Sequence, residues 1–390
     1  MNIAATRLLA LPFLALVFLL PFPGTVALRL LLLALGCAVA WRYRREWRMP
    51  AIPFKWALGL WVLVCSLSLA YAVDPAYSLG ELKNELGYAL AAFAAFLAFS
   101  RGRGQIEAVA WTVLASSTTM ALWGMLRHVR LGRWEDGVGG FASLAVICLP
   151  LVLLLWPRAG WRVRSVIAVG MTLIVLGVLA AEQRIVWVVW GCQGCLMVLL
   201  RQCHHSTRLP LLRVLVVAGS LLALAGTAML SVHNRKVDES PADYYDLRND
   251  FRLMQWGKIT RRIMEHPLTG AGFGREGMKK AYPDLVPSKS PMSLMWHPHN
   301  VLLTQGVGMG IPGVLSFLIL MLAMLATYGR FLGHGAEEAR SCAAAGILIV
   351  SGILLRNMTN DLFVRDGALL FWALNGALLG YLLRREGDPA

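Results

Sequence analysis

The chain has 390 residues, of which 57% are hydrophobic and 15% are charged, and its mean hydropathy is +0.60. This composition lies outside the range of soluble globular domains and therefore excludes an ordinary soluble fold. The formal net charge is +15. Much of it falls in short segments between apolar runs, where Lys and Arg indicate membrane topology, so we expect no nucleic-acid partner.

Apolar runs of about 17–25 residues, each long enough to cross a membrane as a helix, recur along the whole chain. They predict an all-α integral membrane protein with about twelve transmembrane helices. A short break containing Pro21, Pro23 and Gly24 predicts that the first two helices form a hairpin. The predicted spans are 6–22, 25–41, 55–73, 86–100, 106–126, 139–157, 163–181, 185–201, 210–231, 300–328, 339–356 and 367–384.

The distribution of Lys and Arg predicts the orientation of these helices, because such residues concentrate in cytoplasmic segments. With both termini in the cytoplasm, residues 74–85 form a short outside loop and the long polar segment 232–299 also lies outside. In a Gram-negative bacterium the protein would then lie in the inner membrane, with segment 232–299 in the periplasm. We therefore divide the chain into helices one to nine (1–231), a periplasmic cap (232–299) and helices ten to twelve with a cytoplasmic C-terminus (300–390).

Several arginines lie on the predicted outer side, against this trend. One interpretation is a solvated basic surface, and the other is an electropositive site that binds an anion at the outer membrane face. These arginines are Arg127, Arg130 and Arg133 after the fifth helix, Arg184 in the turn between helices seven and eight, and Arg248, Arg252, Arg261 and Arg262 in the long segment.

The long outside segment is predicted to form a small, mostly helical cap. Asn249 or Asp250 can cap a helix from about Phe251 to Glu265, in which apolar residues recur at near-helical spacing. A short basic helix is expected over 275–281. The intervening glycine-rich bend, 270–274, is either a plain turn or a source of backbone N–H groups for a phosphate. The cap has too little apolar surface to fold alone, so we expect it to pack on the membrane helices.

The segment His297-Pro298-His299-Asn300 joins this cap to the tenth helix. A histidine titrates near neutral pH and can accept a proton from a hydroxyl, so His299 is the first candidate for a general base. Asn300 can orient it or a substrate by hydrogen bonding, and His297 is a candidate for substrate contact or support. The alternative is that His299 only caps the tenth helix. The glycines that follow, with Pro312, predict close helix packing or a kink.

Arg184 and Arg252 are the candidates for holding an anion. Arg184 interrupts an otherwise apolar hairpin, where an arginine must snorkel, pair with Glu182 or bind an anion. Arg252 lies on the predicted cap helix, and a guanidinium can hold phosphate oxygens through two parallel hydrogen bonds. It could equally be solvated, and Arg248, Arg261 and Arg262 compete for the role.

Two motifs resemble the signature of the O-antigen ligase and polymerase superfamily. The first is His-Asn-x-x-Leu at 299–303, followed by Gly-x-x-Gly at 310–313. The second runs from Arg252 through Trp256 to the glycine-rich bend at 270–274. The many-helix frame with one large outside loop near the C-terminal third is also similar. The resemblance is concentrated between about residues 252 and 313.

This resemblance implies a GT-C-like, inverting, metal-independent glycosyltransferase without a cofactor, embedded in the bilayer. It implies an undecaprenyl-diphosphate-linked O-antigen as donor and the lipid A–core oligosaccharide as acceptor. The family's histidine falls on His299 and its paired arginines on Arg184 and Arg252. The chain departs from the family at Gln183, where Ser or Thr is common, which puts the match of Arg184 in doubt.

Within the superfamily the sequence favours the lipid A–core ligase. Polymerases tend to have two sizeable outside loops, whereas here only one is long, and protein-directed oligosaccharyltransferases are usually longer. Both remain alternatives. A transporter for lipid-linked glycans is the alternative from another class, and it predicts paired half-structures with ionisable residues near the midplane, which the sequence does not display.

Overall fold

The computed structural model describes residues 3–386 except 133, 135–136, 158, 203–250, 287–295, 334, 360, 362 and 364, and only the backbone of 3–7, 138, 201–202 and 251–254. Throughout the described residues the regular elements are helices. In chain order they are α1 (Ile3–Leu19), α2 (Val26–Arg42), α3 (Lys55–Leu67), a 3-10 turn (Ser68–Tyr71), α4 (Pro75–Glu81), a π-helix (Leu82–Gly87), α5 (Tyr88–Phe99), α6 (Arg103–Leu131), α7 (Val138–Leu155), α8 (Trp161–Ala180), α9 (Arg184–Gln202), α11 (Phe251–Glu265), α12 (Gly277–Ala281), a 3-10 turn (Pro283–Leu285), α13 (Val301–Arg330), α14 (Glu337–Arg356) and α15 (Arg365–Leu382).

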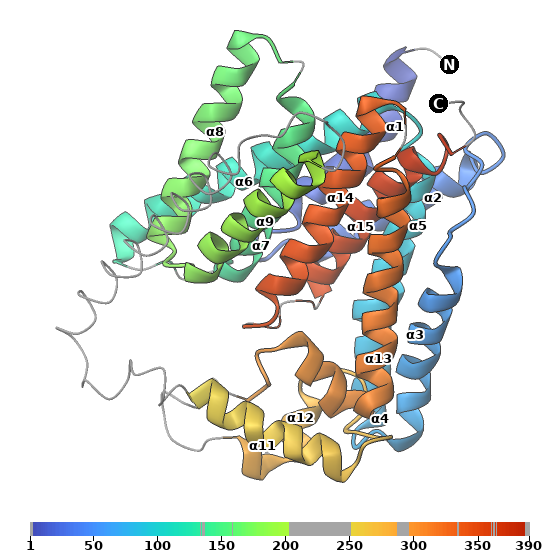
Figure 1. Ribbon diagram of the computed structural model, residues 1–390, viewed down its shortest axis with the longest axis vertical. Helices are drawn as coiled ribbons and strands as arrows, with labels where there is room; N and C mark the ends of the chain where they lie inside the picture. Colours follow the sequence, from blue (N-terminus) through green and yellow to red (C-terminus); the bar gives the residue numbers. More distant parts are fainter. Residues whose placement is uncertain are drawn as a thin grey trace.

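The helices form one bundle, with α11 and α12 at one end and both chain termini at the other (Figure 1). Eleven of the twelve predicted spans coincide with helices, and the twelfth, 210–231, lies outside the described residues. Five helical stretches in the described part of the chain are long and apolar enough to cross a membrane: 75–99, 103–131, 161–180, 301–330 and 337–356. α1 and α2 form the hairpin that the break between them predicts.

Residues 74–85 form a helix, so the prediction of a loop there is wrong. Asp74 begins α4 by accepting a hydrogen bond from the backbone N–H of Tyr77 at 2.9 Å, and Pro75 occupies the first turn. The π-helix Leu82–Gly87 then joins α4 to α5. The carboxylate of Glu81 is buried in the bundle, where it pairs with Arg365 at the start of α15 at 2.8 Å.

Glycines allow α5 and α15 to form the most extensive helix–helix contact among the described residues (Figure 1). A Cβ atom on Gly376 would lie 2.4 Å from the carbonyl oxygen of Phe93, and one on Gly380 would lie 2.5 Å from that of Leu97. This spacing is the small-residue pattern that lets membrane helices approach each other's backbones. Asn375, fully buried on the same helix, accepts a hydrogen bond from the hydroxyl of Tyr328 on α13 at 2.8 Å.

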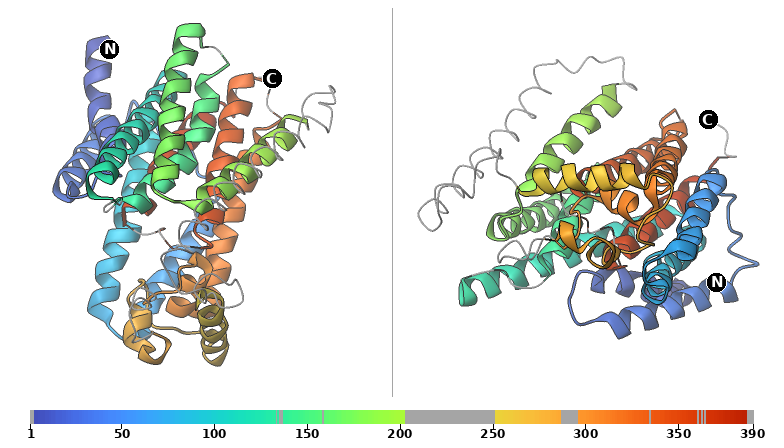
Figure 2. Two further views of the ribbon diagram at one scale, coloured as in Figure 1. Left: turned by 90° about the vertical axis from the view of Figure 1, so that its left-hand side faces the viewer. Right: turned by 90° about the horizontal axis from the view of Figure 1, so that it is seen from below.

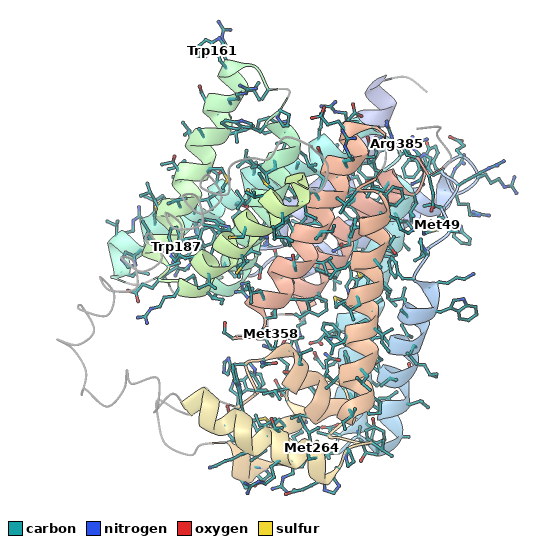
Figure 3. The ribbon with its side chains drawn as sticks, in the orientation of Figure 1. Met49, Trp161, Trp187, Met264, Met358 and Arg385 are labelled. Atoms are coloured by element: carbon teal, nitrogen blue, oxygen red, sulfur yellow. The ribbon has the colours of Figure 1, made fainter. Side chains whose placement is uncertain are left out.

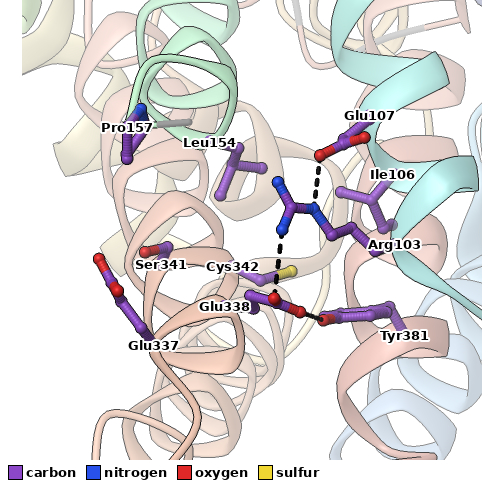
Figure 4. A pocket seen from close by; sticks show the side chains of 10 residues that line it. All are labelled: Arg103, Ile106, Glu107, Leu154, Pro157, Glu337, Glu338, Ser341, Cys342 and Tyr381. Carbon is purple, nitrogen blue, oxygen red and sulfur yellow. Dashed lines mark hydrogen bonds and ion pairs between the residues drawn. The ribbon is translucent and has the colours of Figure 1, made fainter. Parts of the chain in front are cut away.

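A network of charged side chains ties three helices together at the end of the bundle that carries the termini (Figure 4). Arg103 on α6 pairs with Glu107 on its own helix and with Glu338 on α14 at 3.1 Å. Tyr381 on α15 donates a hydrogen bond to the other oxygen of Glu338 at 3.2 Å. The network surrounds a small pocket and fixes α6, α14 and α15 at this end.

α13 is broken at Gly310, as its glycines and Pro312 predict, and the break receives the cap. Gly310 has a φ of +65°, a backbone conformation that favours glycine. The carbonyl oxygens of Val307 and Gly308 accept hydrogen bonds from the N–H groups of Ala271 and Gly272 at 2.8 and 2.9 Å. Two amides of the 270–274 bend are thus used by backbone, and the bend serves to hold the cap against α13 rather than to present these groups to a phosphate.

The cap contains the helix predicted over 251–265 and packs on α13 as expected. Its own small core consists of Ile259, Ala271, Met278 and Leu285 together with Val307 of α13. Seen along the bundle, α11 lies across the end of the molecule (Figure 2, right). The predicted basic helix is present but shorter, at Gly277–Ala281.

Candidate functional site

The site is centred on the two histidines at the junction of the cap with α13. His299 has a φ of +52°, which is uncommon for a residue other than glycine and is often found at functional sites. Its backbone N–H donates a hydrogen bond to Nδ1 of His297 at 3.2 Å, and the two imidazole rings lie 3.8 Å apart. Trp256 of α11 donates from its indole nitrogen to the carbonyl oxygen of Pro298 at 2.7 Å. The cap helix therefore holds the loop in this conformation.

His297 is a neutral, buried support for His299. Its exposed fraction is 4%. Burial, with smaller contributions from the nearby His299 and Arg275, lowers the pKa of His297 to about 2. Its Nδ1 is therefore unprotonated at physiological pH and remains an acceptor for the backbone of His299. His299 itself is half-buried.

Asn300 caps α13 and fixes the loop to the bundle. Its side-chain oxygen accepts hydrogen bonds from the N–H groups of Leu302 and Leu303 at 2.9 and 3.2 Å. Its amide nitrogen donates to the carbonyl oxygen of Met358, after α14, at 3.1 Å, and the Val301 N–H donates to that of Asn357 at 2.9 Å. Asn300, and not His299, is therefore the residue that caps the N-terminus of α13.

Two charged residues beside the histidines were not singled out from the sequence. Asp361, in the connection between α14 and α15, is 1% exposed and interacts electrostatically with His299 and Arg275. Burial raises the pKa of the Asp361 carboxyl, and the neighbouring Thr304, Arg275 and His299 oppose that shift. Arg275 donates to the backbone carbonyl of Asp361 at 3.0 Å and lies 5.4 Å from the ring of Trp296.

A cavity with room for about one water molecule lies beside these groups. Arg275 and Asp361 line it, together with Thr304 and Gln305 of α13 and Glu85 of the π-helix. The segment predicted as an outside loop therefore contributes a carboxyl group to the site. Nothing in the local sequence reveals this, because Glu85 and Asp361 are far apart in the chain.

Arg184 occupies the first position of α9, after a tight turn in which Glu182 has a φ of +51°. Its side chain is half-buried and makes no hydrogen bond or ion pair with another residue that the structure describes. Trp187, in the first turn of α9, and Met358, beside Asn300, both lie toward the end of the bundle that faces α11 (Figure 3). Arg184 therefore starts its helix on the same side as the histidine loop.

Of the remaining predicted arginines, the structure describes the side chains of Arg127, Arg130, Arg261 and Arg262. Arg262 of α11 pairs with Glu265 at 3.2 Å and Asp284 at 2.9 Å, and it stabilises the cap. Arg127 lies over the ring of Trp123 on α6. Arg130 is exposed at the end of α6, and Arg261 is exposed on α11. The backbone of Arg252 lies in the first turn of α11, but its side chain is outside the described residues. Arg133 and Arg248 also lie outside the described residues.

Residues 136–318 match the family model described as O-Antigen ligase. This match supports membership of the O-antigen ligase/polymerase superfamily. The matched segment runs from the start of α7 through the cap to the middle of α13 and so includes the histidine loop. Members of this superfamily are glycosyltransferase-like enzymes, either ligases or polymerases. The match supports the family predicted from the two motifs. No curated protein matches the chain.

Proposed function

We propose that this member of the superfamily is a ligase that transfers O-antigen glycan from undecaprenyl diphosphate to the lipid A–core oligosaccharide. The reaction would take place on the periplasmic face of the inner membrane by inverting transfer without a metal. The observation that carries the proposal is the His297–His299 pair, held at the start of α13 inside the segment that matches the family.

His299 is assigned the role of base. The acceptor hydroxyl oxygen attacks the anomeric carbon of the donor, the bond from that carbon to the diphosphate oxygen breaks, and His299 receives the hydroxyl proton. The diphosphate leaves with the bonding electron pair. A positioned base of this kind contributes about 10²–10⁴-fold to the rate. Asp361 supports this assignment, since its electrostatic interaction with His299 favours the imidazolium that forms.

Arg184 and Arg252 are assigned to the diphosphate, whose negative charge grows as the bond breaks. Fixed donors at a developing charge contribute about 3 kcal/mol each. Arg275 is added to this set because it is the arginine whose contacts place it beside the histidine loop. Arg127, Arg130, Arg133, Arg248, Arg261 and Arg262 would attract the anionic head groups of donor and acceptor.

A polymerase is the alternative within the same superfamily, and a lipid-linked glycan transporter is the alternative from another class. The long segment 232–299 is the only predicted outside loop of that size, because residues 74–85 are short and helical, and this favours the ligase. The charged groups of the candidate site, Arg275 and Asp361, lie beside the histidine loop where the cap meets α13. This position argues against a transporter, whose ionisable groups are expected near the midplane.

The test is transfer by the purified protein, with undecaprenyl-diphosphate-linked glycan, rough lipopolysaccharide and EDTA. Ligase activity would appear as a ladder of lipopolysaccharide bands that falls at least a hundredfold in His299→Ala. Extension of the lipid-linked glycan without the ladder would mean a polymerase. Full activity in both His299→Ala and Arg184→Ala would overturn the assigned site.

A further inference from the structure

Four arginines lie close together in the chain at the end of α2, away from the cap. Residues 42–48, which we call the arginine turn, contain Arg42, Arg44, Arg45 and Arg48, all with exposed side chains, and a single acid, Glu46. Met49, directly after the turn, lies toward the end of the bundle that carries the termini, as Arg385 does (Figure 3). The proposed glycosyl transfer uses none of these side chains.

The charge of the arginine turn is not neutralised by carboxylates, unlike that of other arginines at this end of the bundle. Arg103 and Arg385 both form ion pairs with Glu338. Among the residues that the structure describes, none forms an ion pair with an arginine of the turn. The turn therefore keeps a formal charge of +3, from its four arginines and Glu46. An uncompensated positive charge of this density attracts an anion.

Contacts with the bundle hold the backbone of the turn in one conformation. The ring of Trp47 is buried and stacks on that of Tyr43, with the two centroids 5.4 Å apart. Arg384, just after α15, donates to the carbonyl oxygens of Trp47 and Arg48 at 3.4 and 2.9 Å. The guanidinium of Arg101 lies 5.0 Å from the centre of the Trp47 ring and adds a further cation. The arginines are thus presented from a fixed frame, so less conformational entropy is lost when several of them bind one anion.

The surface of α2 that leads to the turn is apolar and exposed. Leu31 and Leu35 are both exposed, and their spacing of four residues places them on one face of the helix. Arg42 follows Leu35 by seven residues, which is two helical turns, and so ends the same face. Trp41 is 68% exposed, and the guanidinium of Arg44 lies 4.1 Å from the centre of its ring. Exposed tryptophans are typical of the level at which membrane helices meet lipid head groups.

A ligand that uses both the cations and the apolar face needs a negatively charged head and an apolar tail. An acidic protein segment or a free phosphate ion would leave the apolar face of α2 and Trp41 without a contact. We propose that the arginine turn binds the head group of an anionic phospholipid, whose acyl chains lie along the exposed face of α2. This site is separate from the histidine loop, and the inference does not depend on the proposed glycosyl transfer.

Selective capture of an anionic lipid tests the proposal. The probe is phosphatidylglycerol with a photoreactive diazirine in one acyl chain, bound to the purified full chain in a neutral detergent, and crosslinked peptides are identified by mass spectrometry. Crosslinks to α2 and the arginine turn are expected, at least about tenfold stronger than those of the matched phosphatidylcholine probe, whose choline cancels the phosphate charge. Equal labelling by the two probes would overturn the proposal. So would displacement by inorganic phosphate at the same concentration, because the site would then recognise the ion alone.

Removal of two charges from the turn should weaken this capture. One cation beside anionic lipid contributes about fivefold to binding, so the double variant Arg44→Gln, Arg45→Gln should raise the Kd for phosphatidylglycerol about 25-fold. The matched control is Arg162→Gln, Arg164→Gln in the first turn of α8, two exposed arginines that also form no ion pair with a described residue. The control should bind within about twofold of the wild type. Equal weakening in both double variants would mean a general attraction to basic surface and would rule out this site.

A variant that keeps the charge separates electrostatic binding from damage to the turn. Arg44→Lys, Arg45→Lys should retain binding within about threefold, because lysine keeps the positive charge and loses only the fork of donors. Phosphatidylglycerol should raise the Tm of the wild type and of this lysine variant more than that of the glutamine variant. Binding by the lysine variant as weak as that of the glutamine variant would contradict an electrostatic site. Neither donor nor acceptor glycan is present in these assays, so their outcome is independent of whether the protein is a ligase.

Discussion

Replacement of His297 by asparagine tests the burial of this histidine directly. The side-chain amide can take the place of Nδ1 as acceptor for the His299 N–H, but it does not titrate. In the wild type the pKa of His297 is lowered to about 2, so the folded protein leaves it unprotonated in acid. An unfolded histidine has a pKa near 6.5 and binds a proton below that pH. The folded state therefore loses stability as the pH falls below about 6.5 and regains it as the pH rises.

The size of the effect follows from the two pKa values. Between pH 7.5 and pH 4.5 the unfolded chain gains this proton and the folded protein does not, which costs about 2.5 kcal/mol. For a chain of 390 residues, this corresponds to a fall in Tm of roughly 3 °C. The variant lacks this contribution.

The assay is thermal unfolding of the purified protein in detergent at both pH values, followed by tryptophan fluorescence. The wild type should lose about 3 °C more than His297→Asn between pH 7.5 and 4.5. His266, exposed at the end of α11, is the control, and His266→Asn should behave as the wild type. If the wild type and His297→Asn showed equal pH dependence, His297 would be protonated in the folded protein, and its role as an acceptor would be wrong.

Three further substitutions examine the surroundings of the histidine loop. Asn300→Ala removes the cap of α13 and should lower the unfolding free energy by about 1–2 kcal/mol, measured as a fall in Tm that Asn300→Asp largely restores. Gly310→Ala would place a Cβ atom 2.5 Å from the carbonyl oxygen of Pro267, at a residue with a φ of +65°. It should lower the free energy of unfolding by more than about 1 kcal/mol. Gly329→Ala, in open surroundings on the same helix, is the control and should leave Tm unchanged or slightly higher. Arg275→Gln should reduce glycan transfer by about 10–100-fold, the loss expected for one charged hydrogen-bond donor, while Lys279→Gln, exposed on the cap, should retain wild-type rates; equal rates in both would remove Arg275 from the site.

Hydropathy, together with capping residues, glycines and prolines in the sequence, was sufficient to predict most of the helices. Long apolar runs predict membrane helices because each must satisfy its backbone internally, and the cap helix over 251–265 was correctly placed from its capping residues and its apolar spacing. The break at Gly310 follows equally from Gly and Pro. The helix at 75–87 was missed although Asp74 and Pro75 are ordinary start signals, because residues 74–85 were interpreted as a short loop between two predicted spans.

Only part of the candidate site could be predicted from the sequence. The two histidines and Asn300 are adjacent in the chain and carry recognisable chemistry. Asp361 and Arg275 were missed because their roles depend on tertiary contacts, and a lone charge in a loop gives no sign of burial. The same limit applies to Glu81, whose burial depends on Arg365, 284 residues away.

The break in α13 at Gly310 ties the cap to this helix through backbone hydrogen bonds on both sides of the break. The cap is joined to the first half of α13 by the backbone hydrogen bonds of Ala271 and Gly272, and the Ile311 N–H donates to Pro267 on the other side of the break at 2.7 Å. Opening of the cap as a hinged lid would break these backbone hydrogen bonds, and this cost opposes such a motion.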